Sequence, residues 1–177
     1  EASTGLSGLL GSNTLEAVAI STDLTGVAVA ADNQGNFYNY YLGIWTLNAN
    51  GLSAGDVISG GLYIFNNKVH VITVNGEYAS KTASSAFTID GLIAGVSNDN
   101  IIGLAQKGGN LYMMNSNEQL FESDDNGTSW TEITNNLASL SVNISNFNIS
   151  TQGVYTATSA DGTIAVSTNG VTWLDKG

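Results

Sequence analysis

Residues 122–133, ESDDNGTSWTEI, hold the most specific pattern in the chain. A serine leads into acidic residues, an Asn-Gly pair, a tryptophan and an alternating segment. Asn-Gly favours tight hairpin turns, because both turn residues can adopt a positive φ angle. A tryptophan just after such a turn can fold back over it and bury a large apolar area. The stretch therefore predicts an anchored β-hairpin, and residues 166–175, VSTNGVTWLD, form a weaker copy.

Four segments share one plan of short apolar strands, polar turns and a glycine followed within three residues by an aromatic side chain. The glycines are Gly43, Gly76, Gly127 and Gly170, and the aromatics are Trp45, Tyr78, Trp130 and Trp173. The glycine spacings of 33, 51 and 43 residues are irregular but of the size of a propeller blade. In the first segment we expect strands near 16–21, 27–32, 36–42 and 44–48. No helix is predicted beyond a short turn near 136–140.

This repeat predicts an all-β fold, a small β-propeller of four blades with four antiparallel strands each. Sandwiches and jelly rolls are also built from short antiparallel strands, but they have no reason to repeat a turn-glycine-aromatic unit. The predicted propeller covers residues 14–177, with blades at about 14–52, 53–92, 93–138 and 139–177. Residues 1–13 precede it as an N-terminal arm.

The charge balance excludes several partners. The chain has 177 residues, a net charge of −11, four lysines and no arginine, so it cannot supply the basic patch that nucleic acids or anionic membranes require. No apolar run is long enough to span a bilayer. The absence of cysteine excludes disulfides and thiolate chemistry.

Three features favour an extracellular or cell-surface, secreted protein: low charge, a start at Glu1 without methionine, and N-x-S/T sequons. The alternative is that the start is an arbitrary boundary. The candidate glycosylation sites are Asn126, Asn143 and Asn148.

The segment SDDNGTSW resembles the Asp-box of bacterial-neuraminidase-type (BNR-like) repeats, S-x-D-x-G-x-T-W. The matching residues are Ser123, Asp125, Gly127 and Trp130, and Ser129 replaces the usual threonine. The last repeat keeps only Gly170, Thr172 and Trp173. Val166 and Thr168 occupy its serine and aspartate positions, so this copy is degenerate.

The resemblance implies a structural turn at the periphery of a propeller, remote from catalytic centres. Asp125 is expected to accept backbone N–H groups within the turn, and Trp130 to cover apolar surface between blades. The alternative is a ligand or calcium role for Asp124 and Asp125.

Catalytic groups are scarce. The sialidases of this family hold their substrate with three arginines, and this chain has none. His70, the single histidine, is predicted to be a surface or packed residue, and one imidazole is too few for a histidine-based metal site. The remaining carboxylates cluster at Glu118, Glu122, Asp124 and Asp125, and we interpret them as solvated turn acids. We therefore expect no enzyme, no cofactor and no metal site.

Two apolar segments bear on partners. The run NFYNYYLGIW, residues 36–45, suits packing between blades or binding of sugars. The arm carries Leu6, Leu9 and Leu10 in a Gly/Ser background, so we expect it to pack either on the last blade, closing the ring, or as a strand donated to a neighbouring copy.

These observations predict a non-enzymatic, extracellular structural protein that self-assembles into a filament or surface assembly. The partners would be copies of itself. A carbohydrate-binding or adhesive propeller, which would bind glycans, is the alternative, and a divergent hydrolase that uses only carboxylates is a third hypothesis.

Overall fold

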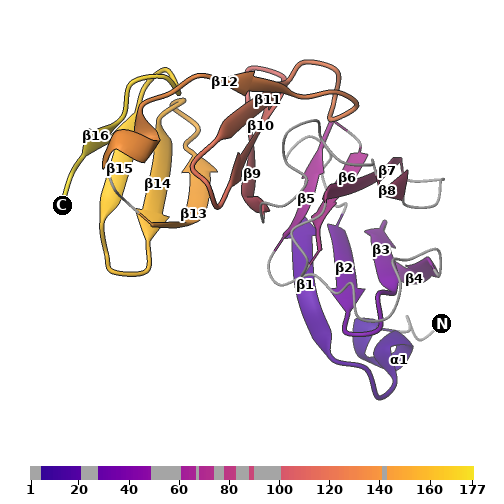
Figure 1. Cartoon of the computed structure of the whole chain (residues 1–177). Coiled ribbons are helices and arrows are strands. Elements are labelled where there is room, and N and C mark those ends of the chain that lie inside the picture. Colours follow the sequence, from indigo (N-terminus) through magenta and orange to yellow (C-terminus); the bar gives the residue numbers. More distant parts are fainter. Residues whose placement is uncertain are drawn as a thin grey trace. The chain divides into compact units, whose positions relative to one another are not determined.

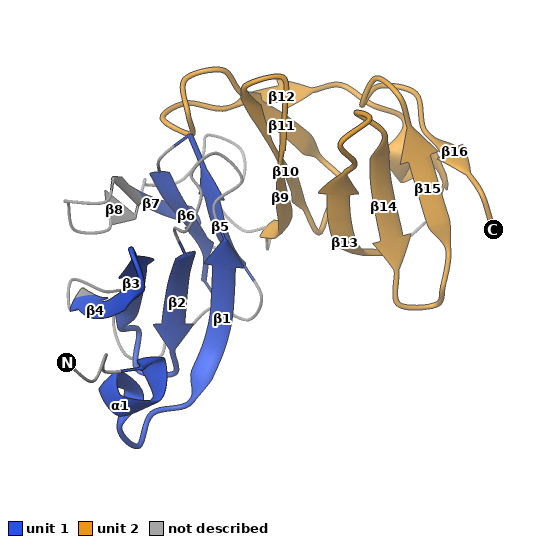
Figure 2. Cartoon of the chain, turned by 180° about the vertical axis from the view of Figure 1, so that it is seen from behind, with its two compact units in different colours: residues 1–90 blue, residues 91–177 orange. Residues whose placement is uncertain are grey.

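The computed structural model describes residues 5–20, 28–48, 61–66, 68–73, 78–82, 88–89, 101–140 and 143–177. They form four antiparallel sheets of four strands, and in each sheet the strands are neighbours in chain order (Figure 1). The chain divides into two compact units, Glu1–Asp90 and Gly91–Gly177, with two sheets in each (Figure 2). The sequence analysis expected one propeller domain over residues 14–177.

The N-terminal unit holds the first and second sheets. The first consists of β1 (Leu15–Ile20), β2 (Ala28–Asp32), β3 (Phe37–Tyr41) and β4 (Ile44–Asn48). The second consists of β5 (Leu62–Phe65), β6 (Lys68–Ile72), β7 (Tyr78–Thr82) and β8 (Thr88–Ile89). One face of each sheet packs against the other in a shared apolar core: Ala19, Val29, Ala31, Phe37, Leu62, Ile64, Val69, Val71 and Ala79.

The C-terminal unit holds the third and fourth sheets. The third consists of β9 (Ile101–Lys107), β10 (Asn110–Asn115), β11 (Leu120–Ser123) and β12 (Thr131–Ile133). The fourth consists of β13 (Ile144–Ile149), β14 (Tyr155–Ser159), β15 (Ile164–Ser167) and β16 (Leu174–Asp175). The first strands of the two sheets, β9 and β13, lie side by side. A Cβ at Gly103 would lie 2.8 Å from the Phe147 carbonyl oxygen, so only glycine fits at this approach.

One five-residue turn recurs between the second and third strands of the sheets. Its first residue accepts the N–H of the fifth residue through a side-chain oxygen, and its fourth residue has a positive φ angle. The first residues are Asp32, Asn115 and Ser159, and the fourth residues are Gly35, Glu118 and Gly162. Thr73 holds the corresponding place after β6, and its turn lies outside the described residues. The spacings of 41, 42 and 44 residues make this turn the true period of the chain.

This period explains the irregular glycine spacing. Trp45 is the second residue of β4, the fourth strand of its sheet, and Trp130 and Trp173 directly precede the fourth strands β12 and β16. Tyr78 instead begins β7, a third strand. The glycine–aromatic pair predicted for the second repeat therefore belongs to a different turn from the other three, and Gly76 itself lies outside the described residues.

The arm was predicted to be a strand, and this part of the prediction is wrong. Residues Leu6–Leu10 form a short helix, α1, which lies near β4 of the first sheet. The Asn13 side chain donates a 2.7 Å hydrogen bond to Asp32 of β2, and Thr14 and Asn33 exchange further hydrogen bonds. The arm is thus tied to the sheet that follows it.

The short turn of helix predicted near 136–140 is confirmed as a 3-10 helix, η1 (Leu137–Leu140). Among the described residues, no helix has the length and apolar character needed to cross a membrane.

Candidate functional site

The turn between β11 and β12 is held by its own side chains. The Ser123 hydroxyl donates to Asp125 Oδ1 and accepts the Gly127 N–H, both at 2.8 Å. Asp125 also accepts the Ser129 N–H at 2.8 Å and the Ser129 hydroxyl at 2.7 Å. The hydrogen bonds from Ser129, then those from Ser123 and Thr128, hold the pKa of Asp125 at about 2. Its carboxylate is therefore engaged in shaping the turn, as predicted.

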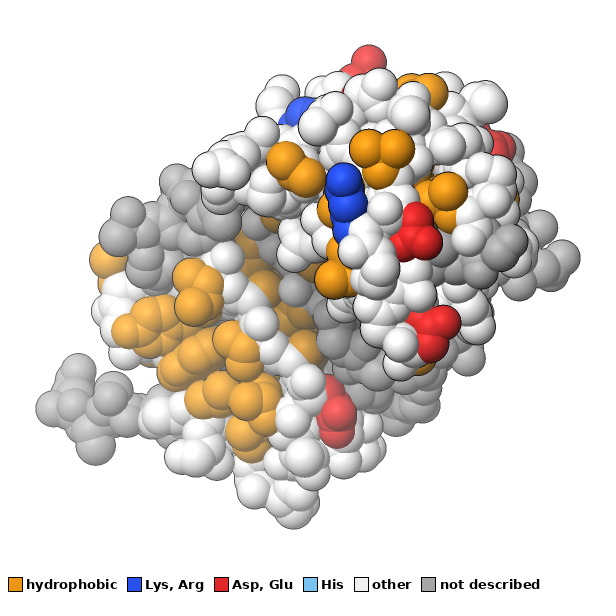
Figure 3. Space-filling model, turned by 90° about the vertical axis from the view of Figure 1, so that its left-hand side faces the viewer, with side chains coloured by type: hydrophobic (Ala, Val, Ile, Leu, Met, Phe, Trp, Pro, Cys, Tyr) orange, Lys and Arg blue, Asp and Glu red, His pale blue; other side chains and the backbone are white. Residues whose placement is uncertain are grey.

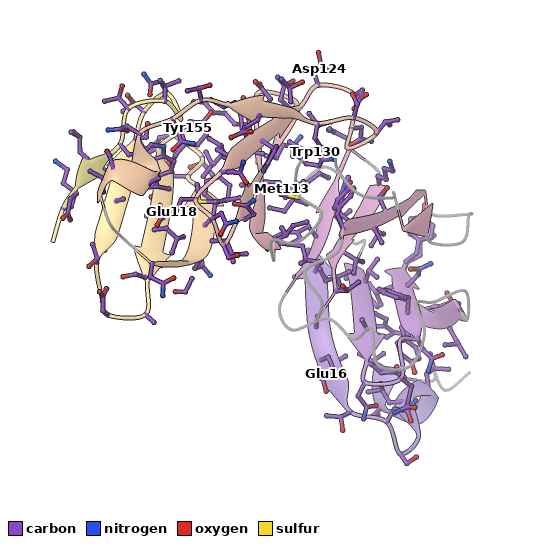
Figure 4. All side chains as sticks on the ribbon, in the orientation of Figure 1. Glu16, Met113, Glu118, Asp124, Trp130 and Tyr155 are labelled. Atoms are coloured by element: carbon purple, nitrogen blue, oxygen red, sulfur yellow. The ribbon has the colours of Figure 1, made fainter. Side chains whose placement is uncertain are left out.

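Asp124 plays no part in this hydrogen-bond set. It is exposed and points outward from the loop (Figure 4). Among the described residues, no group of three or more His, Cys, Asp or Glu side chains could hold a metal ion.

The degenerate copy before β16 proves to be a complete turn one residue shorter. The Ser167 hydroxyl accepts the Gly170 N–H at 2.9 Å, and Asn169 Oδ1 accepts the N–H groups of Val171 and Thr172, both at 2.9 Å. Ser167 and Asn169 thus take the places of Ser123 and Asp125. The sequence reading placed Val166 and Thr168 there because it kept the longer spacing, and this assignment is wrong.

The two tryptophans that follow these turns differ in burial. Trp173 is 1% exposed, donates from Nε1 to the Gly170 carbonyl at 3.0 Å, and packs edge-on against Tyr155. Trp130 lies along the loop to β12 and is only partly buried (Figure 4). The anchoring role expected of Trp130 is therefore filled most completely by Trp173.

Of the remaining acids, Glu122 accepts the Tyr112 hydroxyl and the Asn110 amide, both at 2.7 Å. Burial, followed by the bonds with Glu122 and Tyr155, raises the pKa of Tyr112. A tyrosine nucleophile needs a lowered pKa, so Tyr112 keeps its proton and acts in packing. Burial also raises the pKa of Glu118, which holds the positive-φ position of its turn.

His70 is a packed residue, as predicted. It is fully buried between Phe65 and Tyr78. Nε2 lies 3.4 Å from the Phe65 carbonyl oxygen, which only accepts, so Nδ1 is the acceptor for the Tyr78 hydroxyl at 2.7 Å. Burial lowers the pKa of His70 to about 4, so the imidazole is neutral at physiological pH.

Asp32 is a buried carboxylate of the N-terminal unit, with no exposed surface. Tyr38 donates to it at 2.6 Å, and Asn13 and Asn36 donate from their side chains at 2.7 and 3.0 Å. Burial alone would raise the pKa of Asp32, but these hydrogen bonds outweigh it and lower the pKa to about 2. The cluster fixes the arm and the turn and leaves no free acid for chemistry.

A hollow of about 440 Å³ lies between the β9–β10 and β13–β14 turns, lined by Gln106, Lys107, Gly108, Gly109, Ser150, Thr151, Gln152 and Gly153. The Lys107 ammonium lies 4.3 Å from the centre of the Tyr155 ring and 3.4 Å from the Thr168 carbonyl oxygen. The lining is polar and open to solvent, which suits a hydrogen-bonding ligand rather than an apolar one.

Two of the three sequon asparagines are exposed. Asn143 precedes β13, and Asn148 lies within β13 between the buried Phe147 and Ile149, so its side chain is on the outer face of the fourth sheet. Asn126 is partly buried, with a φ of 60° in the β11–β12 turn.

The two sides of the first sheet differ in burial at β1. The side of β1 that faces the second sheet carries Ala17 and Ala19, whereas the opposite side carries Val18 and Ile20, which are 50% and 72% exposed. We call the exposed pair Val18 and Ile20 on β1 the open face. Tyr40, Trp45 and Leu47 lie on the same side of the sheet, on β3 and β4, and the buried Ala30 and Tyr38 separate them from β1. Figure 3 shows hydrophobic side chains gathered on the N-terminal unit, at the lower left of the view.

The aromatic run behaves in two ways. Phe37 and Tyr38 are buried, and the rings of Tyr40 and Trp45 lie 5.1 Å apart on the side of the sheet away from the shared core. Tyr41, however, is 61% exposed next to the hairpin tip. Packing accounts for the first four side chains and leaves Tyr41 free for a ligand.

The second and third sheets differ from the first one. In the second sheet His70, Tyr78 and Ser80 are buried on one side, and Val69, Val71 and Ala79 on the other. The third sheet buries Tyr112, Met114 and Leu120 on one side, and Leu111, Met113 and Phe121 on the other. Within the described residues, neither of these two sheets carries a large hydrophobic side chain as exposed as Val18 or Ile20, whereas the fourth sheet exposes Ile164 and Leu174 at 39% and 55%.

The described sheets match those of several solved propeller structures. The YCF48 structure titled as bound to D1 peptide aligns with 92% of this chain at 13% identity and a TM-score of 0.69. Streptogramin B lyase aligns with 91% at 12% identity and a TM-score of 0.65. The computationally designed Ika4 protein aligns with 88% at 13% identity and a TM-score of 0.63. No protein-family model matches the sequence, and no curated protein matches it.

The lengths differ among these structures. The chain spans 53% of both YCF48 and the lyase, about half their length, and 91% of Ika4. At such low identity the likeness to the lyase shows the fold alone. What the likeness establishes is architecture: the chain has an all-β fold of four four-stranded sheets, and this fold is that of β-propeller proteins.

Proposed function

We propose that the chain is a non-enzymatic structural protein that assembles with copies of itself, as a subunit of an extracellular filament or surface assembly. The open face is the observation that carries this proposal, because Val18 and Ile20 are 50% and 72% exposed on β1, while Ala17 and Ala19 on the other side of the same strand pack in the shared core. Contiguous exposed apolar surface marks interaction sites in soluble proteins. The resemblance of the two tryptophan turns to Asp-boxes supports the structural role, since such turns stabilise a propeller without taking part in chemistry.

Charge supports an apolar contact rather than an ionic one. With a net charge of −11, two copies repel each other wherever their acids meet. Val18 and Ile20 themselves carry no charge, and the exposed Glu16 precedes them on β1. Contact through this face buries apolar area and keeps the acids in solvent.

Sedimentation velocity over a wide concentration range tests the proposal. The wild-type chain should sediment as particles of more than one copy, and Ile20→Lys should reduce their mass because it places a charge in the contact. Ile164→Lys, at a 39% exposed position of the fourth sheet, is the matched control. A wild-type chain that is monomeric throughout contradicts the proposal.

Carbohydrate binding is the second candidate, favoured by the exposed Tyr41 ring and the polar hollow beside Lys107. Aromatic rings pack against sugar faces, and hydroxyl and amide groups bind their hydroxyls. Glycan-array binding that is lost in Tyr41→Ala or Lys107→Ala would establish it. Secretion and glycosylation are checked by mass spectrometry of the native protein, with attached sugars expected at the exposed Asn143 and Asn148.

A further inference from the structure

We infer that β4 forms a second self-contact, in which the β4 strands of two copies pair edge to edge across a two-fold axis. This inference rests on the proposed self-assembly and deepens it. It concerns a different surface from the contact through Val18 and Ile20, because β4 lies at the opposite edge of the first sheet from β1.

The length of β4 sets it apart from the fourth strands of the other sheets. β4 has five residues, whereas β8, β12 and β16 have two, three and two. Very short edge strands protect a sheet against pairing with another chain, and long apolar ones invite it. Within the described sheets, β4 lacks this protection.

Charge and exposure single out the same hairpin. Residues 37–48, which form β3, the turn and β4, contain no charged side chain in a chain of net charge −11. Ile44 is 57% exposed, and Leu47 is 49% exposed although α1 lies near β4. Lysine at the edge and inward-pointing charges are the usual devices against edge pairing, and this hairpin has neither.

The register of the hairpin shows which backbone groups point outward. Tyr41 and Ile44 flank the two-residue turn Leu42–Gly43 and pair with each other. In such hairpins the flanking residues form a hydrogen-bonded pair, and the pairs then alternate along the ladder. Ile44 and Thr46 therefore face β3, whereas the N–H and C=O groups of Trp45 and Leu47 point away from it.

This spacing suits a two-fold pair. If two β4 strands run antiparallel with Thr46 opposite Thr46, then Trp45 of each copy lies opposite Leu47 of the other, and these two residues exchange both main-chain hydrogen bonds. Trp45 and Leu47 lie on the same face of the sheet, so their side chains also make an apolar cross-strand contact. Thr–Thr and aromatic–aliphatic cross-strand pairs are both favourable.

Two different two-fold contacts have a geometric consequence. One such contact gives a closed dimer. Two that alternate along a series of copies give an open chain of subunits. The open face and the β4 edge together therefore account for a filament, which neither could build alone.

A cysteine experiment tests the edge contact directly, because the chain has no native cysteine. Opposed residues of a non-hydrogen-bonded antiparallel pair lie about 4.5 Å apart at Cα, within the range that a disulfide bridges. Thr46→Cys should oxidise to a covalent dimer, whereas Leu42→Cys at the 79% exposed hairpin tip should not do so at the same rate. Equal cross-linking of both variants contradicts the inference.

Leu47→Pro and Leu47→Lys supply the second readout. The proline removes an outward N–H and keeps the bonds to β3, as edge strands tolerate, and circular dichroism confirms that the variant folds. Both variants should weaken the edge contact at least about tenfold, a change of roughly 1.4 kcal/mol, and leave dimers joined through the open face. Ile20→Lys should instead leave dimers that Thr46→Cys still cross-links.

The outcomes separate the two claims. If Leu47→Pro and Leu47→Lys assemble like the wild type, the edge contact is wrong and the proposed function stands. If Ile20→Lys assembles like the wild type while the Leu47 variants do not, the open-face contact is wrong and the edge contact stands. A wild-type chain that never associates overturns both.

Discussion

The N-terminal unit buries a carboxylate and an imidazole, Asp32 and His70, and leaves Val18 and Ile20 in solvent. The C-terminal unit buries neutral polar side chains, such as Ser123 and Ser167, and holds its carboxylate Asp125 at the surface. Both units fold the same four-stranded sheet. The difference shows that the propeller sheet tolerates ionisable groups in its interior when hydrogen-bond partners surround them, and that this choice makes one unit more sensitive to pH than the other.

The largest effect is expected at the tryptophan of the C-terminal unit's last turn. Trp173→Ala should lower the free energy of unfolding by about 3–5 kcal/mol, because the ring is fully buried against Tyr155. Trp130→Ala should cost about half as much, since its ring is only partly buried. Urea denaturation followed by circular dichroism measures both. If both variants lose the same free energy of unfolding, then the match to the Asp-box motif, rather than the burial of the ring, sets the contribution of each tryptophan to stability.

The next largest effect is expected in the pH dependence of stability, which should differ between the two units. The pKa of His70 is about 4 in the folded chain and about 6.5 in the unfolded chain, so the unfolded state binds the proton more tightly. Its contribution is present above pH 6.5 and is lost as the pH falls towards 4, by about 3 kcal/mol. Hydrogen exchange of each unit should show the loss in the N-terminal unit.

His70→Gln is the control for this experiment, because it removes the titrating group. Its stability should not fall over the interval from pH 6.5 to 4 as the wild type's does. Asp32, with a folded pKa of about 2, adds a further loss only below about pH 3.8. An N-terminal unit whose stability is constant from pH 7 to 4 would contradict the burial of a neutral imidazole.

Two glycines, one in each unit, are expected to give losses of stability of intermediate size. Gly170 and Gly43 have φ angles of 76° and 86°, but a Cβ at Gly170 would lie 3.0 Å from Leu120 Cδ2, whereas a Cβ at Gly43 meets nothing within 4 Å. Gly43→Ala should cost about 1 kcal/mol from backbone strain alone, and Gly170→Ala about 2–3 kcal/mol because crowding adds to it. Thermal melts compare them, and a larger loss at Gly43 would be the contrary result.

The smallest effect is expected for Asn169→Asp. Asn169 contributes an acceptor oxygen to the N–H groups of Val171 and Thr172, and a carboxylate supplies the same oxygen, as Asp125 does in the longer turn. The free energy of unfolding should change by less than about 0.5 kcal/mol at neutral pH, measured by urea denaturation. A loss above about 1 kcal/mol would show that the amide N–H₂ group of Asn169 is needed.

Local patterns predicted much of the fold. Strands expected near 16–21, 27–32, 36–42 and 44–48 appear within one residue at most ends, because alternation and turn residues act over short distances. The helix α1 was missed, since the five residues LSGLL include a glycine and show no helical period. Its position depends on Asn13 reaching Asp32, a contact across 19 residues.

The candidate site was less predictable. The role of Asn169 was missed because the turn is one residue shorter than the motif, and hydrogen bonding, not spacing, defines it. The exposure of Val18 and Ile20 was also unpredicted, because alternation identifies two faces of β1 but not which one a neighbouring sheet covers. Both sides of β1 carry apolar residues, so the sequence alone does not show which side is buried.

The recurrent five-residue turn bears on how such a chain can be built and altered. Its first position is Asp32, Asn115 or Ser159 in different sheets, and Ser150 makes the same hydrogen-bond pattern between β13 and β14. What recurs is an oxygen that accepts an N–H four residues later, so the repeats share a function at this position without sharing an amino acid. Gene duplication could therefore be followed by extensive divergence of the copies without loss of the turn. A module of about 42 residues, cut between equivalent turns, is accordingly the natural unit for inserting, deleting or recombining parts of this protein.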